Sequence, residues 1–276
     1  MKVGIVGRGR AAKTLVPAME RAGIGITWWW SRDEGLASSL TLAQSEVLLF
    51  AVSDGAIEEV AELMSQRPSA EQEVWIHLSG SRPGKLLRVS ARRPRSVACM
   101  HPLQALPGFE VPKAHLEGVT AGIDGESEAI KVAHQLATKL GMTPREINAE
   151  HKAMYHAAAV SVAGHATALF SQAIQMMAHA GFQAHQARDA LLPLIQGAID
   201  NLAHGLPQEV ATGPVARGDA LTVLAHLHAI EAHAPGLKRT YLALASEALA
   251  LAEPSLEDEA YRELERILNT AMTDEE

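Results

Sequence analysis

The first residues of the chain have the spacing of a phosphate-binding turn. An apolar run over residues 3–6 leads into Gly7-Arg8-Gly9-Arg10-Ala11-Ala12, which fits the pattern Gly-x-Gly-x-x-Ala, and a helical pattern follows. In such a unit the first glycine permits a tight turn, the second lets a pyrophosphate approach the backbone, and the small third residue lets the helix pack closely on the strand. We therefore expect a dinucleotide site at these six residues. The alternative is an ordinary turn between a strand and a helix.

A serine and an arginine follow the second apolar run. Ser31 and Arg32 come directly after Trp28-Trp29-Trp30, at about the distance where NAD-binding domains place an acidic residue on the ribose 2′-hydroxyl. A guanidinium instead suits a 2′-phosphate, to which it can donate paired, charge-assisted hydrogen bonds. This predicts NADP as the cofactor. In the alternative, Arg32 is a solvated loop residue and Asp33 or Glu34 binds the ribose of NAD.

Small residues end the next two predicted strands. The third ends in Ala51-Val52-Ser53-Asp54 and the fourth in His77-Leu78-Ser79-Gly80. Both lie at the carboxyl edge of an open α/β sheet, where ligands bind. We expect space for the ribose and nicotinamide there, lined by Val52, Ser53, Ser79 and Gly80. Asp54 is the expected N-cap of the helix that follows.

A histidine and a glutamine follow the fifth predicted strand. Cys99-Met100-His101-Pro102-Leu103-Gln104 places His101 and Gln104 beside the expected nicotinamide position. His101 could hydrogen-bond or protonate a carbonyl there, and the alternative is a structural histidine held by Pro102. Cys99 is expected in the core, because no activating charge or metal partner can be assigned to it.

Ionisable side chains also open the first long helical pattern. Lys152 and His156 are four residues apart and therefore share one face of a helix. A lysine near a ketone or imine oxygen could donate a proton or stabilise negative charge. The alternative is that Lys152 pairs with a carboxylate on a solvated surface. Farther along the chain, Asp219 is the expected N-cap of another helix, and Arg217 could hold a substrate carboxylate through two hydrogen bonds.

The composition indicates a soluble, folded protein. With 276 residues, 47% of them hydrophobic and 20% charged, the chain can bury a substantial core. Its formal charge of −8 is distributed, and the one basic cluster, residues 88–95, is short, so we expect no nucleic-acid partner. A single cysteine fits a reducing cytoplasm. No apolar stretch approaches ~18 residues and no signal peptide is evident, so we also expect no membrane partner.

The hydrophobic pattern divides the chain into two parts. Seven apolar runs alternate with helical patterns, which predicts an α/β fold with a doubly wound parallel Rossmann sheet. From about Ala149 the strand patterns stop and alanine-rich helical patterns continue. We expect an NADP-binding Rossmann-like domain at residues 1–148 and an all-helical substrate and dimerisation domain at residues 149–276. The predicted strands are residues 3–6, 25–30, 47–52, 74–78, 96–100, 119–123 and 143–147.

The helical half carries most of the thirteen histidines and a large apolar surface. No pair of histidines has a His-x-x-x-His spacing with a carboxylate, and His226 and His228 point to different faces of a helix, so we expect no metal site. The alanine-rich helices between Glu150 and Glu253 offer more apolar surface than one small bundle can cover. This predicts a homodimer through the helical domain.

Taken together, these motifs resemble a family of Rossmann-like NADP-binding proteins with a C-terminal helical domain of unknown function. The resemblance extends over nearly the whole chain. More distantly, the chain is similar to ketopantoate reductases, pyrroline-5-carboxylate reductases and β-hydroxyacid dehydrogenases. Two motifs discriminate best, namely Lys152 with Tyr155-His156-Ala157-Ala158-Ala159, and Thr212-Gly213-Pro214-Val215-Ala216-Arg217-Gly218-Asp219.

These relatives imply an oxidoreductase that transfers hydride from NADPH to a small polar carbonyl or imine, such as a 2-oxo acid of the ketopantoate type, across a cleft between the halves. Lys152, His156 and His101 would then be catalytic, and Gln104, His165 and Arg217 would bind the substrate. The family pattern has a Ser-Asn pair where this chain has Ala163-Gly164 followed by His165. Either His165 replaces the missing amide or the substrate differs. The alternative function is a regulatory or scaffold protein that binds NADP without turnover.

Overall fold

The chain folds into two compact units. The computed structural model describes residues 1–88 and 94–273, and the units are Met1–Gly164 and His165–Glu276. The division therefore falls after Gly164, not after residue 148, because helix α5 (Lys152–Val160) makes its buried contacts with the first unit. Most of the predicted basic cluster at residues 88–95 lies outside the described residues.

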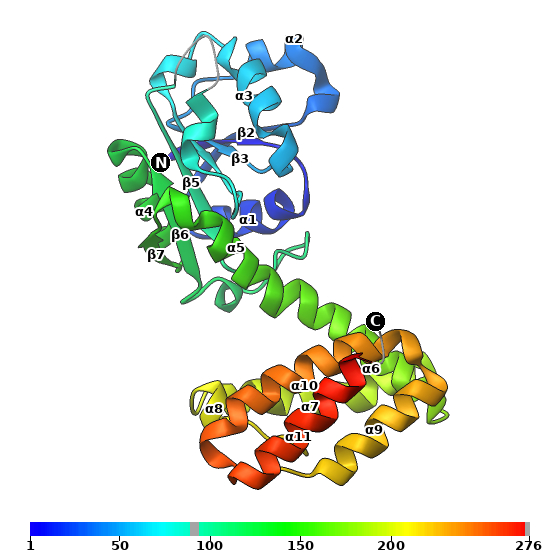
Figure 1. The fold of residues 1–276 in the computed structure, drawn as a ribbon. Helices are drawn as coiled ribbons and strands as arrows, with labels where there is room; N and C mark the ends of the chain where they lie inside the picture. The colour runs from blue at the N-terminus through cyan, green and yellow to red at the C-terminus, as the bar shows by residue number, and fades with distance from the viewer. Residues whose placement is uncertain (89–93, 274–276) are drawn as a thin grey trace. The chain divides into compact units, whose positions relative to one another are not determined.

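The first unit is built on one seven-stranded sheet (Figure 1). The strand order is β2-β1-β3-β4-β5-β6-β7, so β1 lies between its two successors in the chain. All seven predicted strands are present, with ends shifted by at most a few residues. They are β1 (Lys2–Val6), β2 (Gly25–Trp30), β3 (Val47–Phe50), β4 (Val74–His77), β5 (Ser96–Pro102), β6 (Thr120–Gly125) and β7 (Thr143–Glu146).

The sheet departs from the predicted parallel arrangement at one place. Strands β5 and β6 pair antiparallel, whereas β1 to β5 are parallel neighbours and β6 pairs parallel with β7. A parallel pair needs a crossover connection. Helix α4 (Ser127–Lys139) provides one between β6 and β7, but residues 103–119 join β5 to β6 through a loop and a single 3-10 turn. The chain therefore returns in the opposite direction.

Helices cover both faces of the sheet, as a buried parallel sheet requires. Helices α1 (Arg10–Arg21) and α4 pack with one apolar cluster, which includes Leu49 and Ile76. Helix α3 (Ile57–Ser65) packs with the opposite cluster, which includes Leu48 and Trp75. Adjacent residues of one strand thus enter opposite cores, because side chains alternate across a sheet. The short helix α2 (Gly35–Leu40) follows β2.

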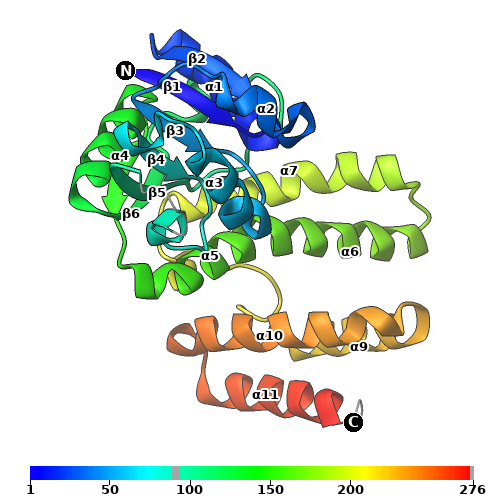
Figure 2. The same cartoon turned by 90° about the horizontal axis from the view of Figure 1, so that it is seen from above.

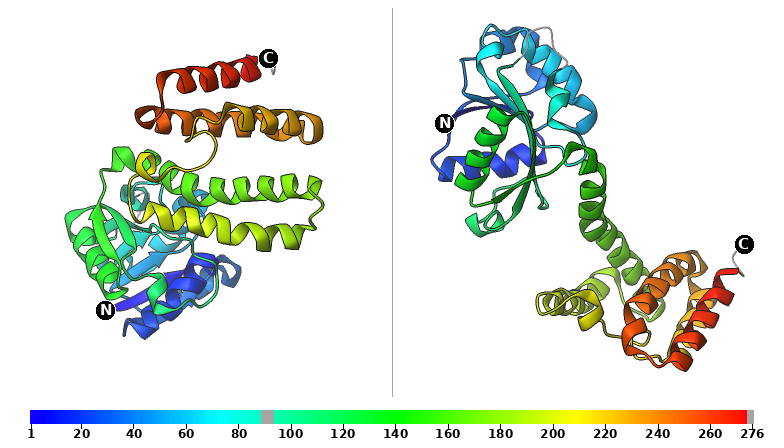
Figure 3. Two further views of the ribbon diagram at one scale, coloured as in Figure 1. Left: turned by 90° about the horizontal axis from the view of Figure 1, so that it is seen from below. Right: turned by 60° about the vertical axis from the view of Figure 1, so that its left-hand side comes forward.

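The second unit is all-helical, as predicted, and has one apolar core. Helices α9 (Ala220–His233), α10 (Lys238–Ala252) and α11 (Asp258–Thr273) form that core around Val223, Leu242 and Leu264. Helices α6 (Ala166–His179) and α7 (Ala184–Leu202) run antiparallel, side by side, as a hairpin (Figures 2 and 3). The short helix α8 (Pro207–Val210) follows the hairpin.

Helix α5 continues without interruption into α6. The five residues Ser161–His165 that join them form a π-helix. Judged by length and composition alone, the resulting helix Ala149–His179 could cross a membrane; its most apolar window has a mean hydropathy of 1.3 and no buried residue. A π-turn inside a helix is rare and often lies at a functional site.

A buried histidine ends β4. His77 is fully buried; its Nε2 bonds the Pro83 carbonyl oxygen at 3.0 Å, and its Nδ1 accepts the Ser79 N–H at 3.1 Å. These two bonds require the neutral ring with the proton on Nε2, because Nδ1 is used as an acceptor. Burial lowers the pKa of His77 to about 4.

Stability should therefore fall as the pH decreases from about 6.5 to 4. The unfolded chain binds a proton on His77 near pH 6.5, whereas the folded protein resists protonation until about pH 4. The stabilisation is complete above the first value and lost below the second. Between pH 7 and pH 5 this residue should cost about 2 kcal/mol of unfolding free energy. Urea unfolding measures the free energy of unfolding at each pH, and this free energy should depend less on pH in His77→Gln than in the wild type. The control His185→Gln, at an exposed histidine, should show the same pH dependence as the wild type. The same pH dependence in all three proteins would contradict the prediction.

Candidate cofactor and substrate site

The glycine turn lies at the point where the strand order reverses. Strand β1 lies between β2 and β3, so the connections that leave these neighbouring strands diverge at their carboxyl ends, which is where open α/β sheets bind ligands. Gly7 has φ +108°, and a Cβ atom there would lie 2.4 Å from the Ala51 carbonyl oxygen. Only glycine fits this backbone conformation and this contact.

The next residues leave the start of α1 open. Gly9 is the N-cap of α1, and a Cβ atom there would meet nothing closer than 3.8 Å, so the backbone is accessible to a ligand. Residues 10–13 contain no acidic side chain. The free N–H groups of this first turn can bind an anion. Ala12 is buried on the sheet side of the helix, in keeping with the predicted need for a small residue.

Two arginines flank the end of β2, and each pairs with a carboxylate. Arg8 donates to the Trp29 carbonyl oxygen at 2.8 Å and pairs with Glu34 at 3.0 Å. The Ser31 N–H also donates to Glu34, at 2.9 Å. Arg32 turns instead toward Glu59 of α3, at 3.1 Å. The structure thus gathers Arg8 and Ser31 around Glu34, and a 2′-phosphate would compete with these carboxylates for both guanidinium groups.

The loops after β3 and β4 approach each other at the same edge. Asp54 does not cap α3 as predicted: a 3-10 turn, Asp54–Ala56, precedes the helix, and the Asp54 carboxylate accepts from the Ser81 hydroxyl at 2.9 Å. The Asp54 carboxylate binds the Ser81 hydroxyl of the neighbouring loop instead of an N–H group of α3. Ser53 is exposed, Val52 is half-buried, and Ser79 and Gly80 are buried.

His101 lies beside Gly80 at the carboxyl end of β5. A Cβ atom at Gly80 would lie 2.8 Å from His101 Nε2 and 2.5 Å from His156 Cδ2, so both rings reach the backbone of this residue. The ring centroids of His101 and His156 are 5.8 Å apart. The structure therefore brings three of the predicted site residues together, two from β-strand ends and one from α5.

A pocket of about 420 Å³ adjoins the two histidines, wholly within the first unit. Gln104 also lines it, although its side-chain amide already bonds the His115 carbonyl oxygen at 3.2 Å. Ala163 and Gly164 of the π-turn, which replace the family's Ser-Asn pair, form part of the wall. The remaining lining is apolar and consists of Leu103, Ala105, Ala159, Val160 and Val162.

Tyr155 fixes the orientation of the His101 ring. Its hydroxyl lies 3.2 Å from His101 Nδ1, and the two rings meet edge to face. Gly122, opposite His101 in the β5–β6 ladder, leaves room for this hydroxyl: a Cβ atom there would lie 2.8 Å from it. The sequence motif contained Tyr155, but its role was not predicted, because strand pairing and not sequence spacing brings it to His101.

Lys152 is buried beneath this pair of rings. Only 1% of its side chain is exposed, and its ammonium contacts Asp124 Oδ1 at 2.7 Å and Cys99 Sγ at 3.0 Å. The alternative, in which Lys152 pairs with a carboxylate on a solvated surface, is therefore wrong. Lys152 is also not among the described residues that line the pocket. Cys99 is in the core, as predicted. Asp124 was missed, although it ends an otherwise apolar run of the sequence.

The surroundings set the protonation of these groups. Burial, together with the nearby His156 and Lys152, lowers the pKa of His101 to about 4, so its ring is neutral at pH 7. Burial raises the pKa of Tyr155 to about 12. For Lys152, burial alone would lower the pKa, but the Cys99 sulfur and the Asp124 carboxylate outweigh it and raise the pKa. The Tyr155 hydroxyl and His101 Nδ1 can share a hydrogen bond in either direction; when Tyr155 donates, the neutral His101 ring carries its proton on Nε2.

The other predicted substrate residues belong to the second unit. His165 begins it and is exposed. Arg217 is exposed and follows the turn at Gly213. The predicted N-cap Asp219 is confirmed, since its carboxylate accepts the Thr222 N–H at 3.1 Å. Substrate-binding roles for His165 and Arg217 stay predictions.

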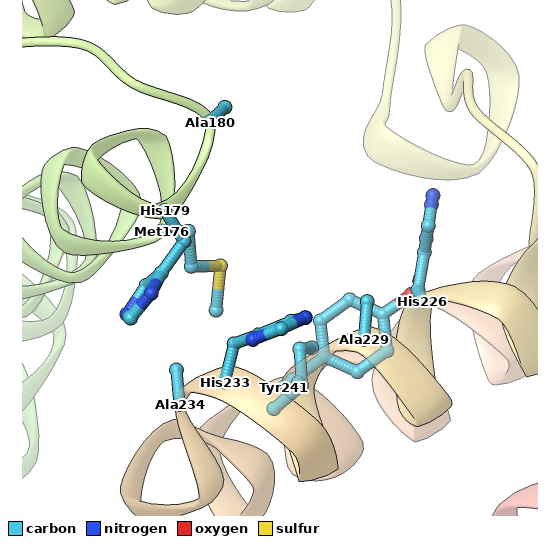
Figure 4. A pocket seen from close by; sticks show the side chains of 9 residues that line it. Met176, His179, Ala180, His226, Ala229, His233, Ala234 and Tyr241 are labelled. Carbon is cyan, nitrogen blue, oxygen red and sulfur yellow. The ribbon is translucent and has the colours of Figure 1, made fainter.

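The second unit has a separate pocket of about 450 Å³ (Figure 4). His179 from α6 and His233 from α9 approach each other with ring centroids 5.9 Å apart, and His226 Nδ1 bonds the Tyr241 hydroxyl at 2.9 Å. Within the described ranges, no group of three or more His, Cys, Asp or Glu side chains could hold a metal ion.

Comparison with known proteins supports the fold. Residues 119–248 match the domain of unknown function DUF2520. No curated protein matches the chain significantly. Among solved structures, a proposed NADP oxidoreductase from Bacteroides fragilis has a TM-score of 0.74 at 20% identity, covering 91% of this chain and 98% of that one. The Thermotoga maritima protein TM1727 has a TM-score of 0.71 at 22% identity, with the same coverage.

A pyrroline carboxylate reductase from Plasmodium falciparum, solved with NADP bound, has a TM-score of 0.59 at 12% identity, covering 95% of this chain and 98% of that one. Likeness at these identities establishes the fold. The resemblance inferred from the sequence is confirmed in this respect: a Rossmann-like sheet is followed by a helical part, and the matched domain of unknown function spans the junction between them. The chain thus has a Rossmann-like fold with a helical C-terminal part, and its residues 119–248 match the DUF2520 domain.

Proposed function

We propose that the protein is an NADP-dependent oxidoreductase that transfers hydride to a small polar carbonyl or imine. One observation carries the proposal: the glycine turn at the strand-order switch and the His101–His156 pocket lie at the same carboxyl edge of one sheet. The fold is shared with a pyrroline carboxylate reductase solved with NADP bound and with a reductive aminase from Aspergillus terreus solved in complex with NADPH.

The residues present fit a dinucleotide. The open backbone at Gly9 and the free N–H groups of α1 would hold the pyrophosphate, and Arg8, Ser31 and Arg32 would meet the 2′-phosphate. Val52, Ser53, Ser79 and Gly80 would border the ribose and nicotinamide. The bound cofactor would supply the hydride; the protein supplies the position and polarity of the acceptor.

His101 is the residue best placed to polarise that acceptor. Its neutral ring can donate Nε2–H to a carbonyl oxygen or imine nitrogen without the cost of a buried positive charge. His156 lies beside it in the same pocket and can take a second polar atom of the substrate. The apolar side chains Leu103, Val160 and Val162 also line this pocket and are exposed in the free chain; a bound substrate that covers them would displace water and strengthen each hydrogen bond. A 2-oxo acid of the ketopantoate type is one candidate substrate.

NADPH should bind at least tenfold more tightly than NADH, a difference of about 1.4 kcal/mol. The reason is that Arg8 and Arg32 can each exchange a carboxylate partner for the 2′-phosphate, which only NADPH carries. Isothermal titration with both nucleotides measures the two affinities. Arg32→Ala should weaken NADPH binding and leave NADH binding unchanged.

Arg188→Ala is the matched control, because Arg188 is also exposed and ion-paired but lies in the second unit. It should leave both affinities unchanged. Equal affinities of the wild type for the two nucleotides, or full discrimination in Arg32→Ala, would contradict the assignment of the phosphate site. If the protein binds NADPH but oxidises it with none of a panel of 2-oxo acids and cyclic imines, a regulatory role would be favoured.

We also propose that the protein is a homodimer formed through the α6–α7 hairpin. Within the described residues of the hairpin, Ala187 alone is buried, while Leu194 is 70% exposed and Leu192, Ile199 and Leu202 are about half exposed. Residues 166–202 contain three charged side chains, Arg188, Asp189 and Asp200. So large an apolar surface on a folded chain marks an interface. A second copy of the hairpin would complete a four-helix bundle about a twofold axis.

Light scattering after gel filtration should give twice the chain mass of 29.5 kDa. Leu194→Glu should shift the protein toward monomer, because the carboxylate would be buried in the interface. The control Leu221→Glu, at an equally exposed leucine of α9, should leave the dimer intact. A monomeric wild type would contradict the proposal. Co-sedimentation of the wild type, but not of Leu194→Glu, with phosphatidylcholine vesicles would also contradict it, because the hairpin would then bind lipid.

A further inference from the structure

The first turn of α5 is anchored to the sheet by a buried ion pair. Lys152, the first residue of the helix, places its ammonium 2.7 Å from Asp124 Oδ1 on β6. The second oxygen of Asp124 accepts the Gly84 N–H at 2.7 Å, so the carboxylate is itself held by the loop after β4. Cys99 on β5 contacts the same ammonium and donates to the Ser79 carbonyl oxygen at 2.9 Å. Four separate segments therefore meet at one buried charge.

This anchor controls where the next residues of the helix lie. Tyr155 and His156 follow Lys152 by three and four positions, so all three lie on adjacent parts of one helix face. On the sheet, Asp124 is two residues from Gly122, which stands opposite His101 in the ladder. The ion pair thus joins the helix that carries Tyr155 to the strand pair that carries His101, close to the place where the two side chains meet.

A buried pair of this kind is a poor source of stability, because desolvation offsets most of the attraction between the charges. In some proteins such a pair instead specifies one arrangement of the elements that it joins. Here the arrangement specified is the approach of the Tyr155 hydroxyl to His101 Nδ1, at 3.2 Å. Lys152 is the only buried residue among the described residues of α5, so apolar packing does not fix the rotation of this helix, and a small rotation would break the Tyr155–His101 contact.

We propose that Lys152 and Asp124 are positioning residues that act through Tyr155: they hold its hydroxyl on His101 Nδ1 and so keep the Nε2–H of His101 directed at the pocket. The catalytic use of the His101 Nε2–H rests on the proposed function, but the contacts among these side chains do not depend on any cofactor or substrate. The positioning role replaces the expectation that Lys152 is the proton donor. The ammonium is buried and occupied by two partners, so it acts on the pocket through another side chain.

The tautomer of His101 can be measured directly in the free protein. Nitrogen NMR of histidine-labelled protein distinguishes a ring protonated on Nε2 from one protonated on Nδ1, and His101→Asn assigns the signals. In the wild type, the Nε2–H form should predominate at pH 7. In Tyr155→Phe the ratio of the two forms should fall about fivefold, which corresponds to the loss of one hydrogen bond.

The ion pair is tested with the double variant K152M/D124N. It leaves no unpaired buried charge, and the asparagine oxygen still accepts the Gly84 N–H, so the fold is retained. Circular dichroism checks this. If the pair positions Tyr155, the tautomer ratio of His101 should shift in the same direction as in Tyr155→Phe. An unchanged ratio in the folded double variant would overturn the proposal, and so would an unchanged ratio in Tyr155→Phe.

The chain offers a matched control in its second unit. Tyr241 bonds His226 Nδ1 at 2.9 Å, with the same edge-to-face geometry as the Tyr155–His101 pair. Tyr241→Phe should change the signals of His226 and leave those of His101 unchanged. A change at His101 would show that its tautomer responds to general loosening and would overturn the proposal. Titration of the same variants with NADPH tests the proposed function separately, since K152M/D124N should retain cofactor affinity.

Discussion

The close approach of β1 and β3 is the constraint on which the candidate site depends. Because Gly7 turns directly against the Ala51 carbonyl oxygen, α1 begins at the sheet edge and not beyond it. The first free N–H groups of that helix and the loops after β3 and β4 then share one small region. A side chain at Gly7 would force the strands apart and move the start of α1.

The same edge carries the polar groups that could act on a substrate, and their character follows from burial. His101 is kept neutral by burial and by the positive charge of Lys152 below it, whereas Lys152 is kept charged by Asp124. The neutral imidazole at the pocket wall can present a hydrogen-bond donor to a substrate atom, whereas the ammonium of Lys152 is occupied by Asp124 and Cys99. The charge itself stays away from the pocket, in the interior of the first unit.

Much of the first unit could be predicted because strands and glycine turns leave local signals. Strands β1 to β5 are short, mainly apolar runs, and Gly7 to Ala12 have a spacing with a known physical cause. The direction of β6 could not be predicted in this way, since an apolar run has the same appearance in a parallel and an antiparallel strand. The lost cap at Asp54 has a similar origin, because its partner Ser81 comes from a different loop.

The candidate site shows the same limit more sharply. His101 and His156 were predicted beside the nicotinamide position, and the structure brings their rings together. The burial of Lys152 depends on Cys99 and Asp124, which are distant in sequence and meet it only through the pairing of β5 with β6. The spacing along α5 correctly predicted that Lys152 and His156 share one face of the helix, but it could not predict how deeply each side chain is buried.

A crystal structure of the protein with NADP bound would show whether the cofactor and the two histidines share one site. The pyrophosphate should lie on Gly9 and the first turn of α1, and the nicotinamide ring should lie at the His101–His156 pocket, with space for one small carbonyl compound between them. A nicotinamide ring held away from both histidines, or a cofactor bound elsewhere on the chain, would contradict this prediction.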